Sequence, residues 1–594
     1  MLKTHTCGEL RLSHVGQRVT LAGWVNVRRD QGGLIFIDLR DRWGIAQVTV
    51  NENQQPDAHH SANDTKPEYV LQITGFVRER PKEMINAKIE TGEVEVEAHE
   101  IKILNAAKTP PFLIKEDSKV DEAVRLKYRY LDLRRQRMQR NIILRGQVVQ
   151  YIREYLTTRD FIEIETPILF KTTPEGARDY LVPSRVHPGK FYALPQSPQQ
   201  LKQLLMVSGF ERYFQIARCF RDEDQRGDRQ PEFTQLDLEM SFVEREDVLN
   251  LVEGMMIGLV EKVSDKTMTF KPFPRLTYAE SILKYGSDKP DLRYGLEIQD
   301  ITGLVGGMGF KVFADVAAAG NAVRALKIPG MGDLPRAQLD ILVDMAKSAG
   351  AKGLSYFAMR KADNGAVTSP ISKFFDEAQI AQIIARMEAE PGDLILMAAD
   401  KASVVCKVMD TMRREFAERL HLADPEKVAF CWIIDFPMFE YNEDERRWEP
   451  AHHMFTMPMD EDMQFLDTDP GRVRGQLYDL VCNGFEMSSG SIRIHQRALQ
   501  EKIFSMIGLS KEVAWDRFGH MLEAFEYGTP PHGGIAPGID RLAMVLAGET
   551  NIREVIAFPK NQRAEDLMAG APSEAEPKQL RELGIGITIE QPLK

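Results

Sequence analysis

Residues 218–240 bring charged, aromatic and apolar side chains together in an order that suits a nucleotide site. The segment, RCFRDEDQRGDRQPEFTQLDLEM, is densely charged at first, and from Phe233 onward polar and apolar residues alternate. Alternation with a period of two predicts a strand, and we expect two strands that pair as a long-looped antiparallel hairpin. One predicted face of the second strand is apolar. The other carries the aromatic ring of Phe233 and the polar side chains of Gln235, Asp237 and Glu239. In the first strand, Arg221 and Glu223 share a face.

This combination of side chains matches what a nucleotide requires. A guanidinium binds a phosphate or a carboxylate through two hydrogen bonds. A phenyl ring stacks on a purine, and carboxylates hold Mg²⁺ against phosphate oxygens. Composition alone favours the alternative, a surface network of ion pairs.

Two later segments supply matching groups. YDLVCNGFEMSSGSIRIH (478–495) contains Asp479 and Glu486, then a predicted strand with Arg493. GGIAPGIDRLAMVLAG (533–548) predicts a glycine-rich strand and turn that enter an apolar helix, with Arg541 at the junction. Glycine lets a ligand approach the backbone, and the arginine would meet a triphosphate. Neither segment matches the P-loop or the dinucleotide fingerprint, which disfavours those folds.

The first hundred residues predict a small barrel. Three strand-like runs lie between residues 18 and 50, and two more begin at 69 and 93, with no long helix among them. Five such strands are typical of an oligonucleotide-binding barrel. An aromatic ring and arginines on one face would stack on and hold splayed bases; the candidates are Arg28, Arg29, Phe36, Gln47 and Arg78. A purely structural barrel with Phe36 in its core is equally compatible with the local pattern.

The remaining chain shows further divisions. Residues 106–118 contain Pro-Pro and mixed polarity, as a hinge does. Residues 119–157 predict strongly basic helices whose arginines are nearly unopposed; they form either a solvated face or a surface along a phosphate backbone. FIEIETPIL (161–169) predicts a strand that stops at Pro167, and the glycine- and alanine-rich residues 288–420 predict an inserted domain.

Bulk properties set outer limits. A chain of 594 residues is too long for one core and should hold about three or four domains. The net charge of -12 argues only weakly against a nucleic-acid partner, because basic residues can be clustered. Five scattered cysteines without a C-x-x-C pair predict no zinc site and a reducing cytoplasm. No apolar run suggests a membrane span or an export signal.

These motifs together resemble one family, the bacterial-type aspartyl-tRNA synthetases of class II, subclass IIb, over essentially the whole chain. FIEIETPIL resembles motif 1, FRDE (220–223) with RQPEF (229–233) resembles motif 2, and GIDR (538–541) resembles the end of motif 3. TPEGARDY (173–180), QSPQQLKQ (196–203), AHHMFT (451–456) and FPKNQRAEDLMAGAPS (558–573) add specificity. The implied fold is multidomain α+β: an OB-fold barrel (1–105), a hinge (106–118), a class II antiparallel-sheet catalytic domain (119–287 and 421–560), an inserted α/β domain (288–420) and a C-terminal extension (561–594).

The resemblance also implies roles for individual residues. Those implied for aspartate are Glu175, Gln199, Gln200, Leu201, Lys202, Arg221, Asp237, His452 and Arg493. Those implied for ATP are Arg221, Asp222, Glu223, Gln230, Phe233, Glu486, Gly538, Ile539, Asp540 and Arg541, with Asp479 and Glu486 holding Mg²⁺. Those implied for the tRNA anticodon are Arg28, Arg29, Gln31, Phe36, Gln47, Arg78 and Lys82. A buried substrate carboxylate needs fixed positive partners, which Lys202 and Arg493 can provide.

The implied activity is ATP-dependent activation of L-aspartate to aspartyl-adenylate, followed by transfer to the 3′ end of tRNA, in a homodimer without a membrane partner. We expect tRNA(Asp) to be the better substrate and leave charging of tRNA(Asn) open; Gln31 and the loop at 80–83 are candidates for that choice. One rival is an ATP-dependent amide-forming enzyme of the same catalytic fold, against which residues 1–105 argue. The other is a non-catalytic nucleic-acid-binding protein, against which the retained chemistry at Arg221, Glu223, Asp479, Glu486 and Arg541 argues.

Overall fold

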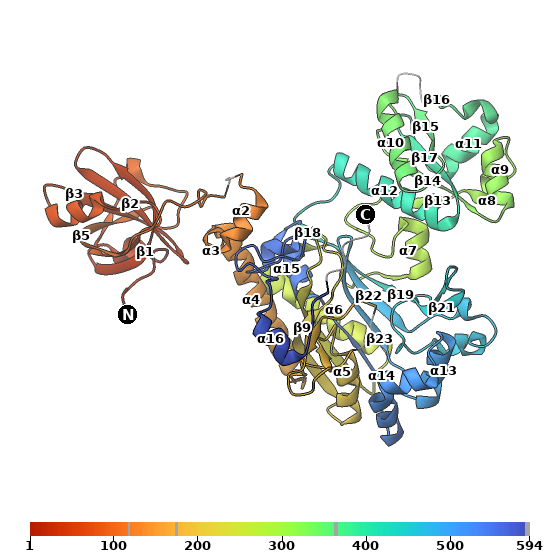
Figure 1. Ribbon diagram of the computed structural model, residues 1–594. Coiled ribbons are helices and arrows are strands. Elements are labelled where there is room, and N and C mark those ends of the chain that lie inside the picture. The colour runs from red at the N-terminus through yellow and green to blue at the C-terminus, as the bar shows by residue number, and fades with distance from the viewer. Residues whose placement is uncertain (117–118, 173–175, 362–365, 589–594) are drawn as a thin grey trace. The chain divides into compact units, whose positions relative to one another are not determined.

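The structure is a computed structural model that separates into two compact units (Figure 1). It describes residues 1–116, 119–172, 176–361 and 366–588. The units are Met1–Gln139 and Arg140–Lys594.

The first unit contains a closed five-stranded barrel in the order β1-β2-β3-β5-β4. Its strands are β1 (Arg18–Asp30), β2 (Leu34–Asp41), β3 (Gly44–Asn51), β4 (Val70–Glu79) and β5 (Val94–Asn105), and the short helix α1 (Pro56–Asn63) lies between β3 and β4. Alternate Val, Ile and Leu residues of each strand fill the interior and leave polar residues outside. The predicted barrel of the oligonucleotide-binding type is confirmed.

The basic segment after the barrel is helical, as predicted, with α2 (Glu122–Lys127), α3 (Arg129–Asp132) and α4 (Gln136–Thr157). The expectation that its arginines are nearly unopposed is wrong. Arg125, Arg129 and Arg135 converge on the buried carboxylate of Asp132, at 3.3, 2.7 and 3.2 Å. A buried carboxylate is stable only with such partners, so these arginines serve the fold of the segment.

The second unit is built on an eight-stranded sheet in the order β12-β19-β22-β23-β24-β10-β9-β6. The strands are β6 (Ile162–Glu163), β9 (Arg212–Phe220), β10 (Glu232–Ser241), β12 (Arg275–Thr277), β19 (Phe430–Ile434), β22 (Leu477–Cys482), β23 (Phe485–Ile492) and β24 (His532–Ile535). All neighbours are antiparallel except the outermost pairs, β12 with β19 and β6 with β9.

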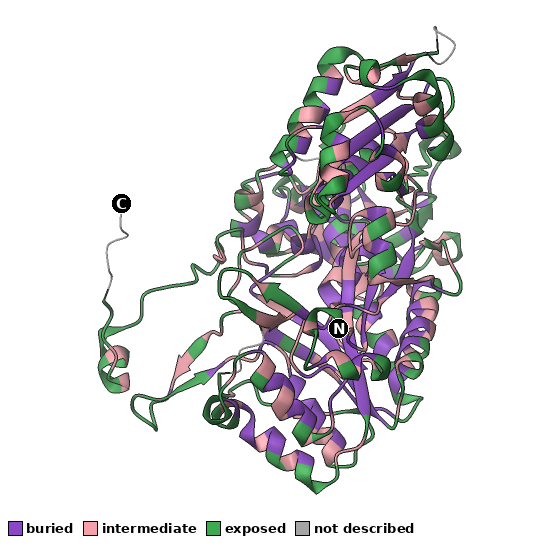
Figure 2. Cartoon of the chain, turned by 90° about the vertical axis from the view of Figure 1, so that its right-hand side faces the viewer, coloured by how far each residue is buried: buried purple, intermediate pink, exposed green. Residues whose placement is uncertain are grey.

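Helices cover one face of this sheet. They are α4, α6 (Arg245–Val263) and α15 (Ile539–Ala547), and their apolar residues share a single core with Leu236 and Leu238 of β10. Figure 2 shows the central strands almost wholly buried, with exposed residues on the outer faces of the helices. The other face of the sheet carries the polar residues of the site.

The predicted hairpin is β9 and β10, paired from Phe220 opposite Glu232 onward. Leu236 and Leu238 lie in the core, and the alternate residue Asp237 lies on the polar face, where it is nevertheless fully buried. The prediction that Arg221 and Glu223 lie in the first strand is wrong. They follow the last residue of β9 in a loop that contains Gly227 and Pro231, and proline cannot continue the hydrogen-bond ladder.

The strand predicted over 161–169 is much shorter in the structure. Only Ile162–Glu163 pairs, as β6, parallel to β9. The residues after it leave the sheet edge ahead of Pro167, which lacks a backbone donor. Ile168 and Leu169 are 49% and 52% exposed, so this stretch presents apolar side chains outward.

The inserted region contains its own five-stranded antiparallel sheet, in the order β13-β14-β17-β15-β16. Its strands are β13 (Ile298–Asp300), β14 (Ala322–Ile328), β15 (Ser355–Met359), β16 (Val367–Thr368) and β17 (Leu394–Asp400). The helices are α8 (Thr302–Val305), α9 (Lys311–Ala318), α10 (Arg336–Ser348), α11 (Glu377–Arg386) and α12 (Ala402–Arg419). Two separate apolar clusters, one with α10 and α12 and one with α8, α9 and α11, cover the two faces.

Other elements complete the second unit. The helices are α5 (Gln199–Val207), α7 (Tyr278–Tyr285), α13 (Arg497–Met506), α14 (Lys511–Ala524) and α16 (Pro577–Leu583). Short paired strands are β7 (Leu181–Pro183) with β8 (Phe191–Ala193), β11 (Thr267–Met268) with β18 (Lys427–Val428), and β20 (Phe439–Asn442) with β21 (Arg447–Pro450). Residues 561–588 include no buried residue. Among the described helices, none combines the length and the apolar character needed to cross a membrane.

Candidate active site

A cavity of about 400 Å³ lies on the polar face of the eight-stranded sheet. It gathers residues from β10, β23, α5 and the loop that joins β24 to α15, which are distant in sequence. The predicted site residues that line it are Gln199, Lys202, Arg221, Glu223, Gln230, Phe233, Asp237, His452, Glu486, Arg493, Gly538, Asp540 and Arg541. The sheet order explains the convergence, because β10 and β23 both neighbour β24.

Five predicted site residues do not line this cavity: Gln200, Leu201, Asp222, Asp479 and Ile539. Ile539 points into the core, because the apolar face of α15 packs on the sheet. Gln200 is buried, and Asp222 forms a backbone bridge with Arg178. Glu175 lies outside the described residues.

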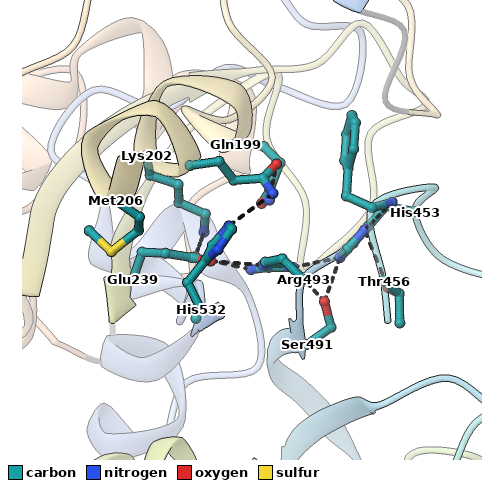
Figure 3. Close-up of polar contacts among 12 residues, drawn as sticks. Gln199, Lys202, Met206, Glu239, His453, Thr456, Ser491, Arg493 and His532 are labelled. Atoms are coloured by element: carbon teal, nitrogen blue, oxygen red, sulfur yellow. Dashed lines mark hydrogen bonds and ion pairs between the residues drawn. The ribbon is translucent and has the colours of Figure 1, made fainter. Parts of the chain in front are cut away.

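A buried network of charges forms one end of the cavity (Figure 3). Lys202 Nζ lies 2.7 Å from Asp237 Oδ1 and 3.2 Å from Glu239 Oε2. Glu239 also accepts from Arg493, Nε to Oε1 at 3.0 Å. Arg493 Nη1 donates to Ser491 Oγ and to His453 Nε2, each at 2.7 Å.

The sequence predicts Lys202 and Arg493 as the fixed positive partners of a buried substrate carboxylate. In the structure both cations already have buried carboxylate partners, so the four charges balance. A buried ion without such a partner would cost several kcal/mol of stability. The network therefore holds both cations in fixed positions at the cavity wall.

Burial shifts the protonation of this end of the cavity. Burial, and then the positive charge of Arg493, lower the pKa of His453 well below its usual value. A neutral imidazole can accept the hydrogen bond from the guanidinium, which has only donors. Burial raises the pKa of Asp237, although Lys202 opposes the shift. Arg493 and then Lys202 offset burial at Glu239, whose pKa is lowered.

The middle of the cavity has an aromatic wall. The guanidinium of Arg221 lies 5.0 Å from the centre of the Phe233 ring, a cation–π contact that fixes both side chains. Glu223 pairs with Arg229 at 3.1 Å. The side-chain amide of Gln230 forms two hydrogen bonds with the backbone of Lys560: it accepts from the N at 2.8 Å and donates to the O at 3.1 Å.

Basic and acidic groups meet at the other end. Arg541 donates to the backbone oxygen of Glu486 and, at 3.1 Å, to Asp228. The Glu486 carboxylate pairs with Lys289 at 2.9 Å. Asp540 is occupied by the fold: its carboxylate accepts from the backbone N of Thr234 at 2.7 Å and from Arg145, also at 2.7 Å.

Asp479 is the least satisfied carboxylate of the region. It is 1% exposed, and neither oxygen has a hydrogen bond of normal geometry among the described residues. Burial, and then the negative charge of Glu486, raise its pKa well above the usual value. Two neighbouring carboxylates, one of them orphaned, fit a hard divalent cation such as Mg²⁺, which takes one or two carboxylates besides phosphate oxygens.

Sequence reasoning missed several residues of the site. Glu239 was placed on the polar face but given no role, although its position in the alternation was the signal. His453, next to the predicted His452, contacts Arg493, whereas His452 packs edge-on against Phe436 at 4.7 Å. Lys289 and Asp228 also line the cavity, and neither stands in a pattern that the sequence alone would single out.

On the barrel, Phe36 is half-buried and stays outside the apolar core, which disfavours the core interpretation. Arg29 lies beside it, pairs with Asp38 through two bonds of 2.9 Å, and donates to Gln47. Gln47 in turn donates to Glu95, a residue that the sequence did not single out.

The other barrel candidates do not all join this group. Arg28 donates to Ala62 and Asn63 of α1, so it holds that helix in place. Arg78 is exposed and pairs with Glu97. Gln31 is exposed between β1 and β2, and Lys82 is exposed in a short 3-10 helix (Lys82–Met84) after β4.

Two family models match the chain. Residues 121–562 match class II tRNA synthetases (D, K and N), and residues 19–104 match an OB-fold nucleic acid binding domain. Solved structures similar in fold include asparaginyl-tRNA synthetase from Pyrococcus horikoshii complexed with asparaginyl-adenylate (TM-score 0.59, 18% identity, 94% of this chain and 98% of that chain). Another is aspartyl tRNA synthetase from Entamoeba histolytica (TM-score 0.57, 19% identity, 93% of this chain and 91% of that chain).

Closer sequence relatives span the entire length. A protein from Rubrobacter xylanophilus named aspartate--tRNA(Asp/Asn) ligase is 57% identical over 99% of this chain and 97% of its own length. One of the same name from Dehalococcoides mccartyi is 53% identical over 100% of both chains. With its antiparallel catalytic sheet and its OB-fold barrel, the chain belongs to the aspartate--tRNA ligase family of class II aminoacyl-tRNA synthetases.

Proposed function

We propose that the protein activates L-aspartate with ATP, releasing pyrophosphate, and transfers the aspartyl group to the 3′ end of tRNA. The observation that carries the amino-acid assignment is the buried pair of cations, Lys202 and Arg493, each fixed by a carboxylate at one end of the cavity. A short acidic amino acid suits that end, because its side-chain carboxylate can meet the two cations while its ammonium group meets the buried carboxylate of Asp237. The rival amide-forming enzyme has no use for an OB-fold barrel.

Aspartate would bind with its side-chain carboxylate toward Lys202 and Arg493. Its ammonium would face Asp237, whose Oδ2 is buried with no hydrogen-bond partner among the described residues. Its α-carboxylate would then point along the cavity toward Arg221, away from the buried end. Gln199 borders this space, whereas His452 lies toward the Glu486 end.

ATP would occupy the rest of the cavity. Adenine would stack on Phe233, with Glu223 beside it, and Arg221 would hold both the α-phosphate and the substrate α-carboxylate. Arg541 would bind the terminal phosphate, and Gly538 lets the nucleotide approach the backbone. Gln230 and Asp540 would act mainly by fixing this wall, since their side chains are engaged by Lys560 and by Thr234 with Arg145.

Asp479 and Glu486 would hold Mg²⁺. When bound, the ion would neutralise charge that develops on the phosphate oxygens. The chain's own residues then do the positioning: the α-carboxylate oxygen attacks the α-phosphorus in line and pyrophosphate leaves. The terminal hydroxyl of tRNA next attacks the carbonyl carbon of the mixed anhydride, the bond from that carbon to the phosphate oxygen breaks, and AMP leaves. No protein nucleophile is required, so the acceleration comes from orientation and fixed charges.

We propose that both tRNA(Asp) and tRNA(Asn) are charged. The support is that relatives 51–57% identical over nearly the full length carry the name aspartate--tRNA(Asp/Asn) ligase. The barrel face with Phe36, Arg29 and Gln47 would bind the anticodon, with Gln31 and Lys82 at its edges. Charging transcripts of both tRNAs at one fixed salt concentration tests this, because phosphate contacts make each rate salt-dependent. Aspartylation of tRNA(Asp) alone would overturn the dual assignment.

We further propose a homodimer. Its support is the exposed apolar run after β6, where Ile168 and Leu169 are exposed. Leu169 borders an open hollow whose apolar lining (Leu169, Phe170, Phe191 and Tyr192) is accompanied by Lys171, Ser184, His187 and Lys190. Exposed apolar surface rimmed by polar residues marks an interaction site, and a self-complementary patch gives a twofold dimer. Sedimentation of the wild type should give a dimer and that of Leu169→Lys a larger monomer fraction; a monomeric wild type contradicts the proposal.

The domain assignment remains part of this proposal: anticodon barrel 1–105, hinge 106–118, catalytic domain 119–287 and 421–560, insertion 288–420 and extension 561–594. A cytoplasmic location belongs to it as well. All five cysteines are buried and none of them is in a disulfide, as a reducing compartment would favour.

A further inference from the structure

Lys289 brings a positive charge to the carboxylate that would hold a metal ion. Its Nζ lies 2.9 Å from Glu486 Oε2 and 3.9 Å from Asp288 Oδ2. Both side chains of the closer pair border the cavity, with 37% and 32% exposure. Glu486 also shares its surroundings with the orphaned carboxylate of Asp479.

The backbone around Lys289 is firmly anchored. Arg413, on α12, donates to the backbone oxygens of Leu296 at 2.8 Å and Gly295 at 3.0 Å. Its guanidinium lies 4.8 Å from the ring of Tyr285 and 5.0 Å from that of Tyr294. Arg413 therefore contacts the chain both before Lys289, at Tyr285, and after it, at Gly295 and Leu296. These contacts fix the backbone from which the Lys289 side chain extends to the cavity.

An ammonium group at this position opposes a free divalent cation. It already neutralises one negative charge of the carboxylate pair, and it repels any further cation that approaches the same oxygens. A cation that arrives with a nucleotide is different, because the phosphates bring negative charge that can engage both the metal and the ammonium. Lys289 should therefore weaken binding of the free metal ion but not binding of the metal–nucleotide complex.

We propose that Lys289 makes metal binding by the Asp479–Glu486 pair conditional on the nucleotide. This is a positioning and selectivity role in the reaction, beyond the residues assigned above, and it rests on the proposed function through the metal site. By linkage, the same coupling strengthens nucleotide binding when the metal is present.

The test uses Mn²⁺ as a spectroscopic substitute and measures its affinity for the full-length protein by electron paramagnetic resonance. Titrations are run with and without saturating ATP, and aspartate is omitted so that ATP is not consumed. Lys289→Met should bind Mn²⁺ without ATP at least about fivefold more tightly than the wild type, as expected for removing one nearby positive charge. With ATP present the difference should shrink or reverse. Lys289→Arg should behave as the wild type does.

Two further variants separate the possible failures. Lys271→Met removes a lysine of a surface ion pair and should leave Mn²⁺ affinity unchanged. Lys289→Met/Glu486→Gln should lose the gain. If Lys289→Met alone shows no gain while Glu486→Gln weakens binding, the role of Lys289 is wrong and the metal site stands. If Glu486→Gln leaves the Mn²⁺ affinity unchanged, the metal site and the inference are both wrong. The proposed function is tested separately, by aspartate-dependent pyrophosphate exchange of the wild type.

Discussion

Arg493 grips Glu239 along one edge of its guanidinium, Nε to Oε1 at 3.0 Å and Nη2 to Oε2 at 3.3 Å, in a fully buried setting. The pairing fixes the plane of the guanidinium, because a carboxylate and a guanidinium match in a planar fork. A strand residue that touches no substrate in the proposed arrangement thereby determines where the substrate-binding cation points.

Glu239→Gln should therefore impair aspartate use without removing either cation. The amide can still bond once to Arg493, but it no longer balances the charges of Arg493 and Lys202. We expect kcat/KM for aspartate to fall at least about tenfold, with the KM for ATP little changed. Pyrophosphate exchange measures both. Glu261→Gln, on α6 in an exposed ion pair with Lys271, is the control and should retain wild-type values.

Lys202→Met should have a larger effect. It leaves Asp237 and Glu239 buried beside one remaining cation, and it removes the partner proposed for the substrate carboxylate. A loss of about 100-fold or more in kcat/KM for aspartate is expected, far exceeding any loss in ATP affinity. Normal aspartate kinetics, in a variant shown to be folded by its melting temperature, would refute the assignment of Lys202.

Phe36→Ala should separate the two halves of the reaction. Aspartyl-adenylate formation should remain intact, and tRNA charging should slow by the loss of a base-stacking contact, roughly 1–3 kcal/mol. Phe76→Ala removes an exposed phenyl ring from β4 of the same barrel and serves as the control. An equal fall in pyrophosphate exchange and in charging would mean that Phe36 supports the fold instead.

Stability should decline as the pH falls from about 7 to 5, because the pKa values of buried His453 and His532 are lowered in the fold. The unfolded chain takes up protons below its ordinary histidine pKa, about 6.5, whereas these folded sites do not. Stability thus rises with pH across this window and is lost toward the folded pKa values.

Melting temperatures at a series of pH values check this expectation. His532 contacts Gln203 and the backbone oxygen of Pro530, so His532→Gln should flatten the profile even if it lowers the maximum. His60→Gln, at an exposed position, should leave the slope unchanged. A melting temperature that stays constant or rises toward pH 5 would contradict the buried-neutral account.

Local patterns in the sequence predicted the elements well wherever one periodicity dominates. The barrel strands, the β9–β10 hairpin and the apolar helix α15 all follow from alternation or from glycine placement, and each is present. The strand at 161–169 was overestimated because alternation cannot show that the sheet edge ends after Glu163. The arginines at 125–135 looked unopposed because a single carboxylate, Asp132, accepts three of them.

The candidate site was predictable only to the extent that family motifs mark it. Residue type and resemblance pointed to Lys202, Asp237 and Arg493, and the cavity brings these together. The internal pairing through Glu239 and His453 depends on long-range register between strands and α5, which no local pattern encodes. Lys289 lies 197 residues from Glu486 in the sequence, so only the folded chain reveals their contact.

The most direct test of the central claim, that fixed cations select aspartate, is amino-acid-dependent exchange of labelled pyrophosphate into ATP. The structures similar in fold include asparaginyl-tRNA synthetases, so L-asparagine is the informative competitor substrate. The account predicts rapid exchange with L-aspartate and exchange with L-asparagine lower by about 1,000-fold or more, since Lys202 and Arg493 have only hydrogen-bond donors and the NH₂ group of a neutral amide offers them no acceptor. Comparable exchange with asparagine, or none with aspartate, would contradict it.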